Sequence, residues 1–136
     1  MEFDNTLKVS TAGMKVQTGR MRVIAENVAN ADSTGATPGA DPYRRKIPTV
    51  NAKFDRTLGA TIAELGKVDR DSSNFDMRYE PGHPAADASG MVKYPNVTPL
   101  IEMTDLRDAQ RGYEANLNVV SSTRQMMLRT LDLLKG

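Results

Sequence analysis

The sequence predicts an α+β fold in which two long terminal helices pair as a coiled coil, with a small irregular β-rich region inserted between them. Near both ends of the chain, apolar residues recur at alternating spacings of three and four, which is typical of a coiled-coil seam. All seven prolines lie between residues 33 and 99, among short runs of β-forming residues. We therefore expect a helical domain made of residues 1–32 and 98–136 and a middle region at residues 33–97.

The first predicted helix runs from the first few residues to about residue 32, where Asn, Asp, Ser and Gly are typical of a helix end. Ser10 and Gln17 interrupt its apolar seam. A second apolar column, Val9, Val16 and Val23, lies beside the seam, so this face is wider than a two-stranded coiled coil needs. The predicted interface residues on this helix are Phe3, Leu7, Met14, Met21, Ile24 and Val28.

The second predicted helix begins at Pro99, because a proline lacks only an N–H that the first turn leaves unpaired. Thr98 is the expected N-cap, and Glu102 would interact favourably with the helix dipole. Gln110 and Arg124 interrupt the seam, and Val119, Met126 and Leu133 form a flanking column. The predicted interface residues here are Leu106, Tyr113, Leu117, Val120, Met127, Leu131 and Leu134.

The width of both apolar faces indicates that the helices pack against more than each other. A hairpin of two helices closing on itself would bury one stripe of each helix and leave the remainder in water. The polar middle region can supply little further cover. We therefore interpret the two seams as an assembly interface as well as an internal contact.

The middle region is expected to contain several short strands. Residues 43–54 mix β-forming and charged residues, and Pro48 limits that segment to a sheet edge. Residues 60–68 favour a strand over a short helix, and residues 90–95 indicate another strand. Between them, residues 74–82 alternate apolar and polar residues before a Pro-Gly turn, which also predicts a strand.

Residues suited to catalysis or ligand binding are few. A formal net charge of +1 provides no broad basic surface for nucleic acid. The chain has no cysteine, and its one histidine, His83, is expected to be structural or solvated. The basic triplet Arg44, Arg45 and Lys46 suits a solvated strand end better than a phosphate site. We predict no enzyme activity, no catalytic residue, no cofactor and no metal site.

The sequence also gives no sign of insertion into a membrane. No apolar run approaches the length of a membrane-spanning helix. The N-terminal residues lack a basic stretch followed by an apolar one, so we expect no cleaved signal peptide.

Two short motifs resemble the terminal signatures of the axial proteins of the bacterial flagellum, which include rod, hook and hook-associated proteins. They lie in "MRVIAENVANADSTG" and "RGYEANLNVV". The short length and the segment "YEPGHPAADASGMVKYPNV" resemble the proximal rod branch of this family, and the resemblance covers essentially the whole chain. The matching signature residues are Asn27, Ala29, Asn30, Ala31, Asp32, Tyr113, Glu114, Ala115 and Asn116.

The resemblance implies a structural subunit of the proximal rod, the drive shaft that crosses the periplasm, transmits torque and houses the export channel. The implied partners are copies of itself, other proximal and distal rod proteins, and the adaptor protein between the MS ring and the rod. The flagellar type III export apparatus would export the chain without a cleaved signal peptide. No nucleic acid is implied as a partner.

Two alternatives come from other classes of protein. A self-contained cytosolic adaptor that binds one partner helix would show similar amphipathic helices. A nucleic-acid binder would use Arg44, Arg45 and Lys46.

Overall fold

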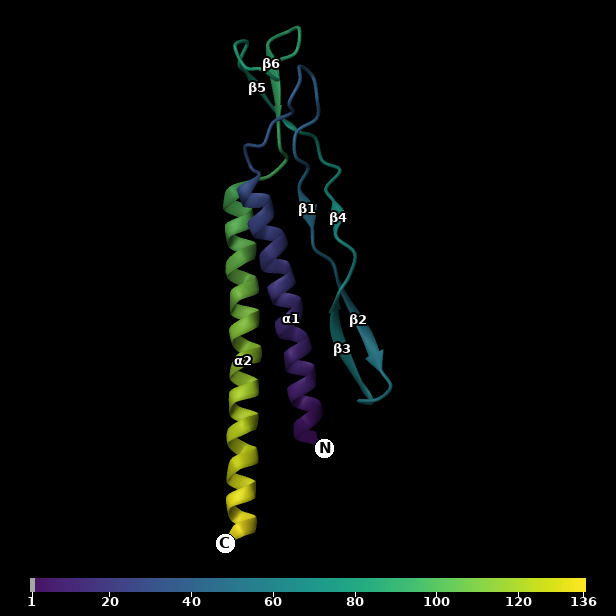
Figure 1. Cartoon of the computed structure of the whole chain (residues 1–136), viewed down its shortest axis with the longest axis vertical. Coiled ribbons are helices and arrows are strands. Elements are labelled where there is room, and N and C mark those ends of the chain that lie inside the picture. The colour runs from purple at the N-terminus through teal and green to yellow at the C-terminus, as the bar shows by residue number, and fades with distance from the viewer. Residues whose placement is uncertain (1) are drawn as a thin grey trace. The chain divides into compact units, whose positions relative to one another are not determined.

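The computed structural model describes residues 2–136, which form a long helix at each end and short strands between them (Figure 1). Helix α1 spans Glu2–Ala29 and helix α2 spans Pro99–Lys135. This order of elements confirms the α+β class. The strands are β1 Lys46–Ile47, β2 Val50–Asp55, β3 Ala60–Leu65, β4 Asp69–Arg70, β5 Asp76–Tyr79 and β6 Met91–Tyr94.

The strands form three separate antiparallel pairs, β1 with β4, β2 with β3, and β5 with β6. In the longest pair, Val50 lies opposite Leu65 and Asp55 opposite Ala60, with Gly59 at a φ of 62° in the turn. Every described strand is therefore an edge strand, and Pro48 falls between β1 and β2, where no ladder hydrogen bond is lost. The irregular β region was predicted, but strand β4 was not.

The described chain divides into two compact units, and each unit combines helix and strand. The first unit contains the chain up to Met21, Thr49–Lys67 and Arg107–Gly136, and so includes the β2–β3 hairpin. The second unit contains Arg22–Pro48 and Val68–Leu106, and so includes the other two strand pairs. The expected division at residues 32 and 98 separates the helices from the strands. Each compact unit instead contains parts of both the predicted helical domain and the predicted middle region.

The helix ends follow from local hydrogen bonds in the second unit. Asn30 Nδ2 donates to the Glu26 carbonyl at 2.9 Å, and Ser33 Oγ donates to Asn30 Oδ1 at 3.0 Å, which satisfies groups left open where α1 ends. At the start of α2, the Thr98 carbonyl accepts the N–H groups of Ile101 and Glu102. The predicted start at Pro99 is confirmed, whereas α1 ends at Ala29, slightly earlier than expected.

The β5–β6 pair packs a small core in the second unit. Val92 is fully buried, and Ala85 and Tyr94 are buried beside it. The Tyr94 hydroxyl lies 3.1 Å from Glu80 Oε2, and the guanidinium of Arg78 stacks 4.0 Å from the centre of the Tyr94 ring. The expected strands at residues 74–82 and 90–95 are thus confirmed.

Candidate assembly interface

In the first unit, the two antiparallel helices meet closely at two glycines. A Cβ atom added at Gly13 would lie 2.9 Å from the amide of Asn116, and one added at Gly112 would lie 2.9 Å from the amide of Gln17. Each glycine precedes an amide residue by four positions on its own helix. The helices therefore make the same contact twice in opposite directions, and only the absence of a side chain permits it.

One of these contacts, Gly13 with Asn116, belongs to a column of residues, seven apart, on each helix. Gly13 faces Asn116 in the first unit, and Asn27 donates to Glu102 in the second unit. Neither column contains a large apolar residue. The columns are Thr6, Gly13, Arg20 and Asn27 on α1, and Glu102, Ala109, Asn116 and Thr123 on α2.

The apolar seams predicted from the sequence lie beside these columns. Ile24 is buried, and so are Val16 and Val23 of the flanking column. In contrast, Leu117 keeps 45% of its surface exposed and Leu131 keeps 51%. The half-buried members are Phe3, Leu7, Met14, Met21, Val28, Leu106, Tyr113, Val120 and Met127.

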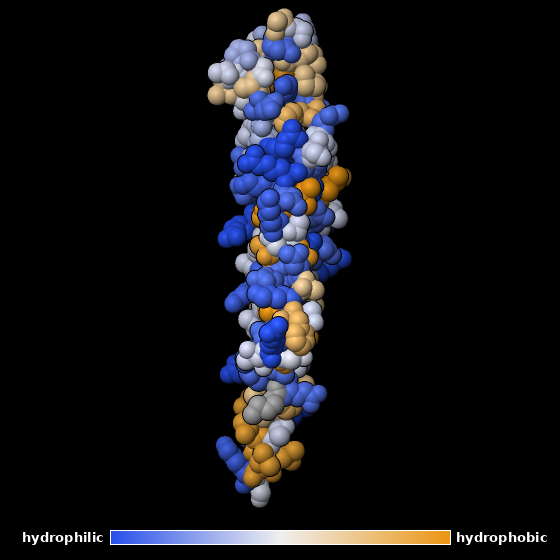
Figure 2. All heavy atoms as spheres, turned by 90° about the vertical axis from the view of Figure 1, so that its right-hand side faces the viewer, coloured by the Kyte–Doolittle hydropathy of each residue, from blue (hydrophilic) through white to orange (hydrophobic). Residues whose placement is uncertain are grey.

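The outer surface of α2 in the first unit is rich in apolar side chains. Val119 and Met126, from the flanking column, are 43% and 48% exposed, and Leu134 is 79% exposed. Figure 2 shows hydrophobic residues gathered at the end of the first unit where α2 terminates. Exposed apolar side chains gathered on one surface are typical of interaction sites, so this part of α2 is a candidate assembly interface.

The second unit instead joins its parts through a buried polar cluster. Asn27 is fully buried, and its Oδ1 accepts the Tyr43 hydroxyl at 2.8 Å and the Lys46 N–H at 2.9 Å. Its Nδ2 donates to the Lys46 carbonyl at 2.8 Å and to Glu102 Oε2 at 3.1 Å. Every polar atom of this amide is therefore paired, so Asn27 fixes the end of α1 against β1 and the start of α2.

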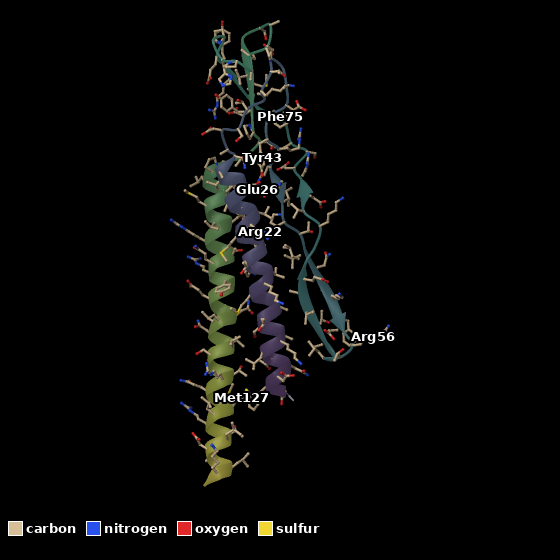
Figure 3. The ribbon with its side chains drawn as sticks, viewed as in Figure 1. Arg22, Glu26, Tyr43, Arg56, Phe75 and Met127 are labelled. Atoms are coloured by element: carbon tan, nitrogen blue, oxygen red, sulfur yellow. The ribbon has the colours of Figure 1, made fainter. Side chains whose placement is uncertain are left out.

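Charged groups complete the same cluster. The Arg45 Nε donates to the buried carboxylate of Glu102, and Arg45 Nη1 lies 3.5 Å from Asp71 Oδ2. Although burial lowers the pKa of Arg45, its hydrogen bond to Glu102 and the negative charges of Glu102 and Asp71 produce a net rise. Burial, followed by the charges of Glu26 and Glu102, raises the pKa of the Tyr43 hydroxyl. Figure 3 shows Glu26 and Tyr43 near the end of α1.

The basic triplet is engaged within the second unit. Arg44 Nη1 donates to the Asp71 and Ser73 carbonyls, and its guanidinium lies 4.2 Å from the Phe75 ring centre. Lys46 Nζ lies 2.5 Å from Glu26 Oε1. Together with the pairing of Arg45, these contacts use the cations that a nucleic-acid binder would direct at phosphates.

His83 and the acidic residues form no metal-binding group within the described part of the chain. His83 Nδ1 accepts the Ala85 N–H at 3.0 Å, which is a turn contact. Across residues 2–136, no three His, Cys, Asp or Glu side chains are grouped so that they could hold a metal ion. In the same residues, no helix is long and apolar enough to cross a membrane.

The signature residues fall into two groups. Asn27, Asn30 and Asn116 make the internal contacts described above. Glu114 and Ala115 are exposed on α2, outside the internal helix contact. The remaining signature residues are Ala29 and Asp32, which are exposed, and Ala31 and Tyr113, which are half-buried.

Sequence reasoning missed the pairing of Arg45 with Glu102. It assigned Glu102 to the helix dipole and Arg45 to a solvated strand end. The available signal was the seven-residue column, since Glu102 shares its spacing with Ala109, Asn116 and Thr123. Apolar spacing does not reveal this column, because its members are small or polar residues.

Two long helices that leave much of the apolar surface of α2 exposed are typical of a structural subunit that assembles with others. Residues 88–133 match the family described as flagellar basal body rod FlgEFG protein C-terminal. Flagellar basal-body rod protein FlgC of Agrobacterium fabrum is 50% identical, over 95% of this chain and 93% of the relative. Those of Salmonella typhimurium and Bacillus subtilis are 37% and 35% identical, over 98% and 95% of this chain and 98% and 96% of each relative.

The class is therefore that of the axial proteins of the bacterial flagellum. Within that class, the chain belongs to the FlgC family of flagellar basal-body rod proteins. It is a structural subunit of the rod, and the resemblance inferred from its terminal motifs is confirmed.

Proposed function

We propose that the chain enters the proximal rod through the apolar surfaces of its terminal helices, above all the exposed surface of α2. The observation that supports this proposal is a difference between the faces of the helices. Within the chain, the helices contact each other through columns of small and polar residues. Many apolar side chains of α2, including Leu117, Val119 and Met126, remain exposed outside that contact.

The energetic argument concerns the exposed side chains. Full burial of a Leu, Val or Met side chain stabilises a protein by about 1.5–3 kcal/mol. In the isolated chain, the outer residues of α2 obtain only part of that stabilisation because much of their surface meets water. Packing against helices of neighbouring subunits would supply the remainder. The residues concerned are Leu117, Val119, Met126, Leu128, Leu131, Leu133 and Leu134.

The proposed neighbours are copies of this chain, other proximal and distal rod proteins, and the adaptor between the MS ring and the rod. In this proposal the rod crosses the periplasm, transmits torque and encloses the export channel. The chain reaches it through the flagellar type III export apparatus without a cleaved signal peptide. It performs no catalysis. Its helices hold neighbouring subunits together and set their alignment in the rod.

The structure favours this proposal over both alternatives. A nucleic-acid binder is disfavoured because Arg44, Arg45 and Lys46 contact groups of the same chain. A small adaptor that binds one helix would need one apolar stripe. Here apolar residues occupy two flanks of α2, represented by Leu117 on one and Val119 on the other. Two flanks suit contact with more than one neighbour.

The test uses Leu117→Asp in cells that lack the native protein. Leu117 is 45% exposed, so a charge there costs the isolated chain little, whereas it would lack solvation in an apolar interface. We expect normal amounts of protein, loss of the subunit from purified basal bodies, and loss of motility. The matched control is Asn118→Asp, at the next exposed position, which should assemble normally. Normal rods containing Leu117→Asp would contradict the proposal.

A further inference from the structure

Methionine is the residue type of this chain that a peroxide oxidises most readily. The sequence has eight methionines but no cysteine and no tryptophan, so a peroxide meets no thiol that would react first. Oxidation to the sulfoxide is reversible, and it converts a flexible apolar side chain into a polar one. The consequence for the protein depends on where the exposed methionines lie.

Among residues 2–136, the methionines differ in exposure. Met77, Met103 and Met126 keep 44%, 54% and 48% of their surface exposed, respectively. Of these three, Met126 alone belongs to the outer surface of α2 in the first unit, because Met77 lies on β5 and Met103 near the start of α2 in the second unit. The half-buried methionines are Met14, Met21, Met91 and Met127.

Met126 lies in the middle of an apolar column on α2. Val119 precedes it by seven residues and Leu133 follows it by seven, and these two side chains are 43% and 84% exposed. Residues seven apart lie on the same side of a helix. The adjacent Met127 belongs instead to the predicted seam and is half-buried. A peroxide therefore reaches a thioether at the centre of the surface that the proposed function assigns to neighbouring subunits.

We propose that Met126 is a site of reversible oxidation that controls whether the free subunit can enter the rod. The oxidant is hydrogen peroxide. The thioether sulfur attacks one peroxide oxygen, the O–O bond breaks and an S–O bond forms. The departing hydroxide takes the proton of the transferred oxygen and leaves as water. The sulfur is oxidised by two electrons and the peroxide is reduced by two.

The inference rests on the proposed function and adds a regulation of the same surface. Water satisfies the sulfoxide oxygen in the free subunit, whereas an apolar interface would remove that water without supplying a hydrogen-bond donor. Oxidation should therefore leave the fold intact but weaken entry into the rod by about tenfold or more, because burial of an unpaired polar group is unfavourable. After assembly, neighbouring subunits would cover Met126, so the oxidant acts on free subunits.

Mass spectrometry after treatment with hydrogen peroxide tests the reactivity of the site. In the purified chain, Met126 should be oxidised about as fast as Met77 and well before Met127. In basal bodies isolated from cells, Met126 should be oxidised much more slowly than in purified chain treated in parallel. Oxidation of Met126 no faster than that of Met127 in the purified chain would overturn the proposal.

Substitutions in cells that lack the native protein test the effect on assembly. Met126→Gln adds a polar group on a side chain of similar length, and should lower the amount of subunit in purified basal bodies about tenfold while the protein is still made. Met77→Gln is the matched control and should assemble like the native chain. Normal incorporation of Met126→Gln would count against the proposal.

A second variant tests the oxidation itself. Met126→Leu conserves volume but has no sulfur, so it should assemble normally and continue to do so at a peroxide concentration that lowers incorporation of the native chain. Met77→Leu is the control and should remain as sensitive to peroxide as the native chain. Equal sensitivity of Met126→Leu and the native chain would refute control by Met126.

The outcomes distinguish this inference from the proposed function. If Met126 is as reactive in basal bodies as in the purified chain, no neighbour covers this part of α2, and the proposed use of that surface is wrong. If Met126 is protected in basal bodies but Met126→Gln assembles normally, the proposed function stands and the control by oxidation is wrong.

Discussion

The two compact units hold α1 and α2 together by different physical means. In the second unit, the buried amide of Asn27 and the buried carboxylate of Glu102 join the helices to each other and, through Arg45 and Lys46, to the chain around β1. In the first unit, glycines allow the helices to approach closely, and side-chain amides lie over them. Buried hydrogen bonds and ion pairs fix one unit, whereas close packing at glycines, together with a surface ion pair between Arg20 and Asp108, fixes the other.

The difference explains where apolar surface remains available. The internal contacts bury a few apolar side chains of α1, such as Val16 and Ile24, but they leave Leu117, Val119 and Met126 of α2 exposed. A conventional leucine-rich internal seam would have buried such residues within the monomer. The use of polar and small contacts inside therefore suits a subunit whose apolar surface is proposed to be covered by neighbours.

The largest effect is expected when the buried charge of the second unit loses its partner. Arg45→Ala leaves the fully buried Glu102 carboxylate uncompensated, which should lower the free energy of unfolding by about 3–5 kcal/mol. Chemical denaturation measures the loss, and hydrogen exchange should place it in the second unit. The matched control is Lys46→Ala, which removes a partly exposed pair with Glu26 and should cost about 1 kcal/mol or less. Equal losses in the two variants would mean that Glu102 is not held by Arg45.

A smaller effect is expected from filling the helix contact of the first unit. Gly13→Val places a side chain where a Cβ already lies 2.9 Å from the Asn116 amide, and overpacking of this kind costs about 1–3 kcal/mol. Asn116→Ala in the same chain should restore part of the stability by making room. Denaturation of the single and double variants gives the coupling energy. Gly82→Ala is the control, because nothing lies within 4 Å of a Cβ there. Additive effects of the two substitutions would contradict the proposed contact.

The smallest effect is a pH dependence at the edge of the polar cluster. Hydrogen bonds from Ser73, and then the charge of Arg45, hold the pKa of Asp71 below its usual value. A lowered pKa in the folded state stabilises the fold above the unfolded-state pKa of about 3.9, and this contribution disappears as the pH falls through the folded-state pKa. Unfolding measured from pH 6 downward should therefore depend less on pH in Asp71→Asn than in the native chain. An unchanged acid profile would contradict this assignment.

By itself, the sequence determined the two long helices, several of the strands and the family. Helical spacing and turn residues act locally, so the start of α2 at Pro99 and the strand β3 at residues 60–65 were predicted correctly. The terminal motifs were sufficient to identify a flagellar axial protein. The residues expected at the assembly interface remain a prediction, although the exposure of Leu117 and Leu134 is consistent with it.

Only the tertiary structure decided which faces of the helices meet. Apolar spacing marks surfaces that avoid water, but it does not say whether the same chain or another one covers them. The close approach at Gly13 and the pairing of Arg45 with Glu102 join residues distant in sequence, and each depends on where the whole backbone runs. Residue type alone does not decide burial in this chain, because the charged Glu102 is buried and the apolar Leu134 is exposed.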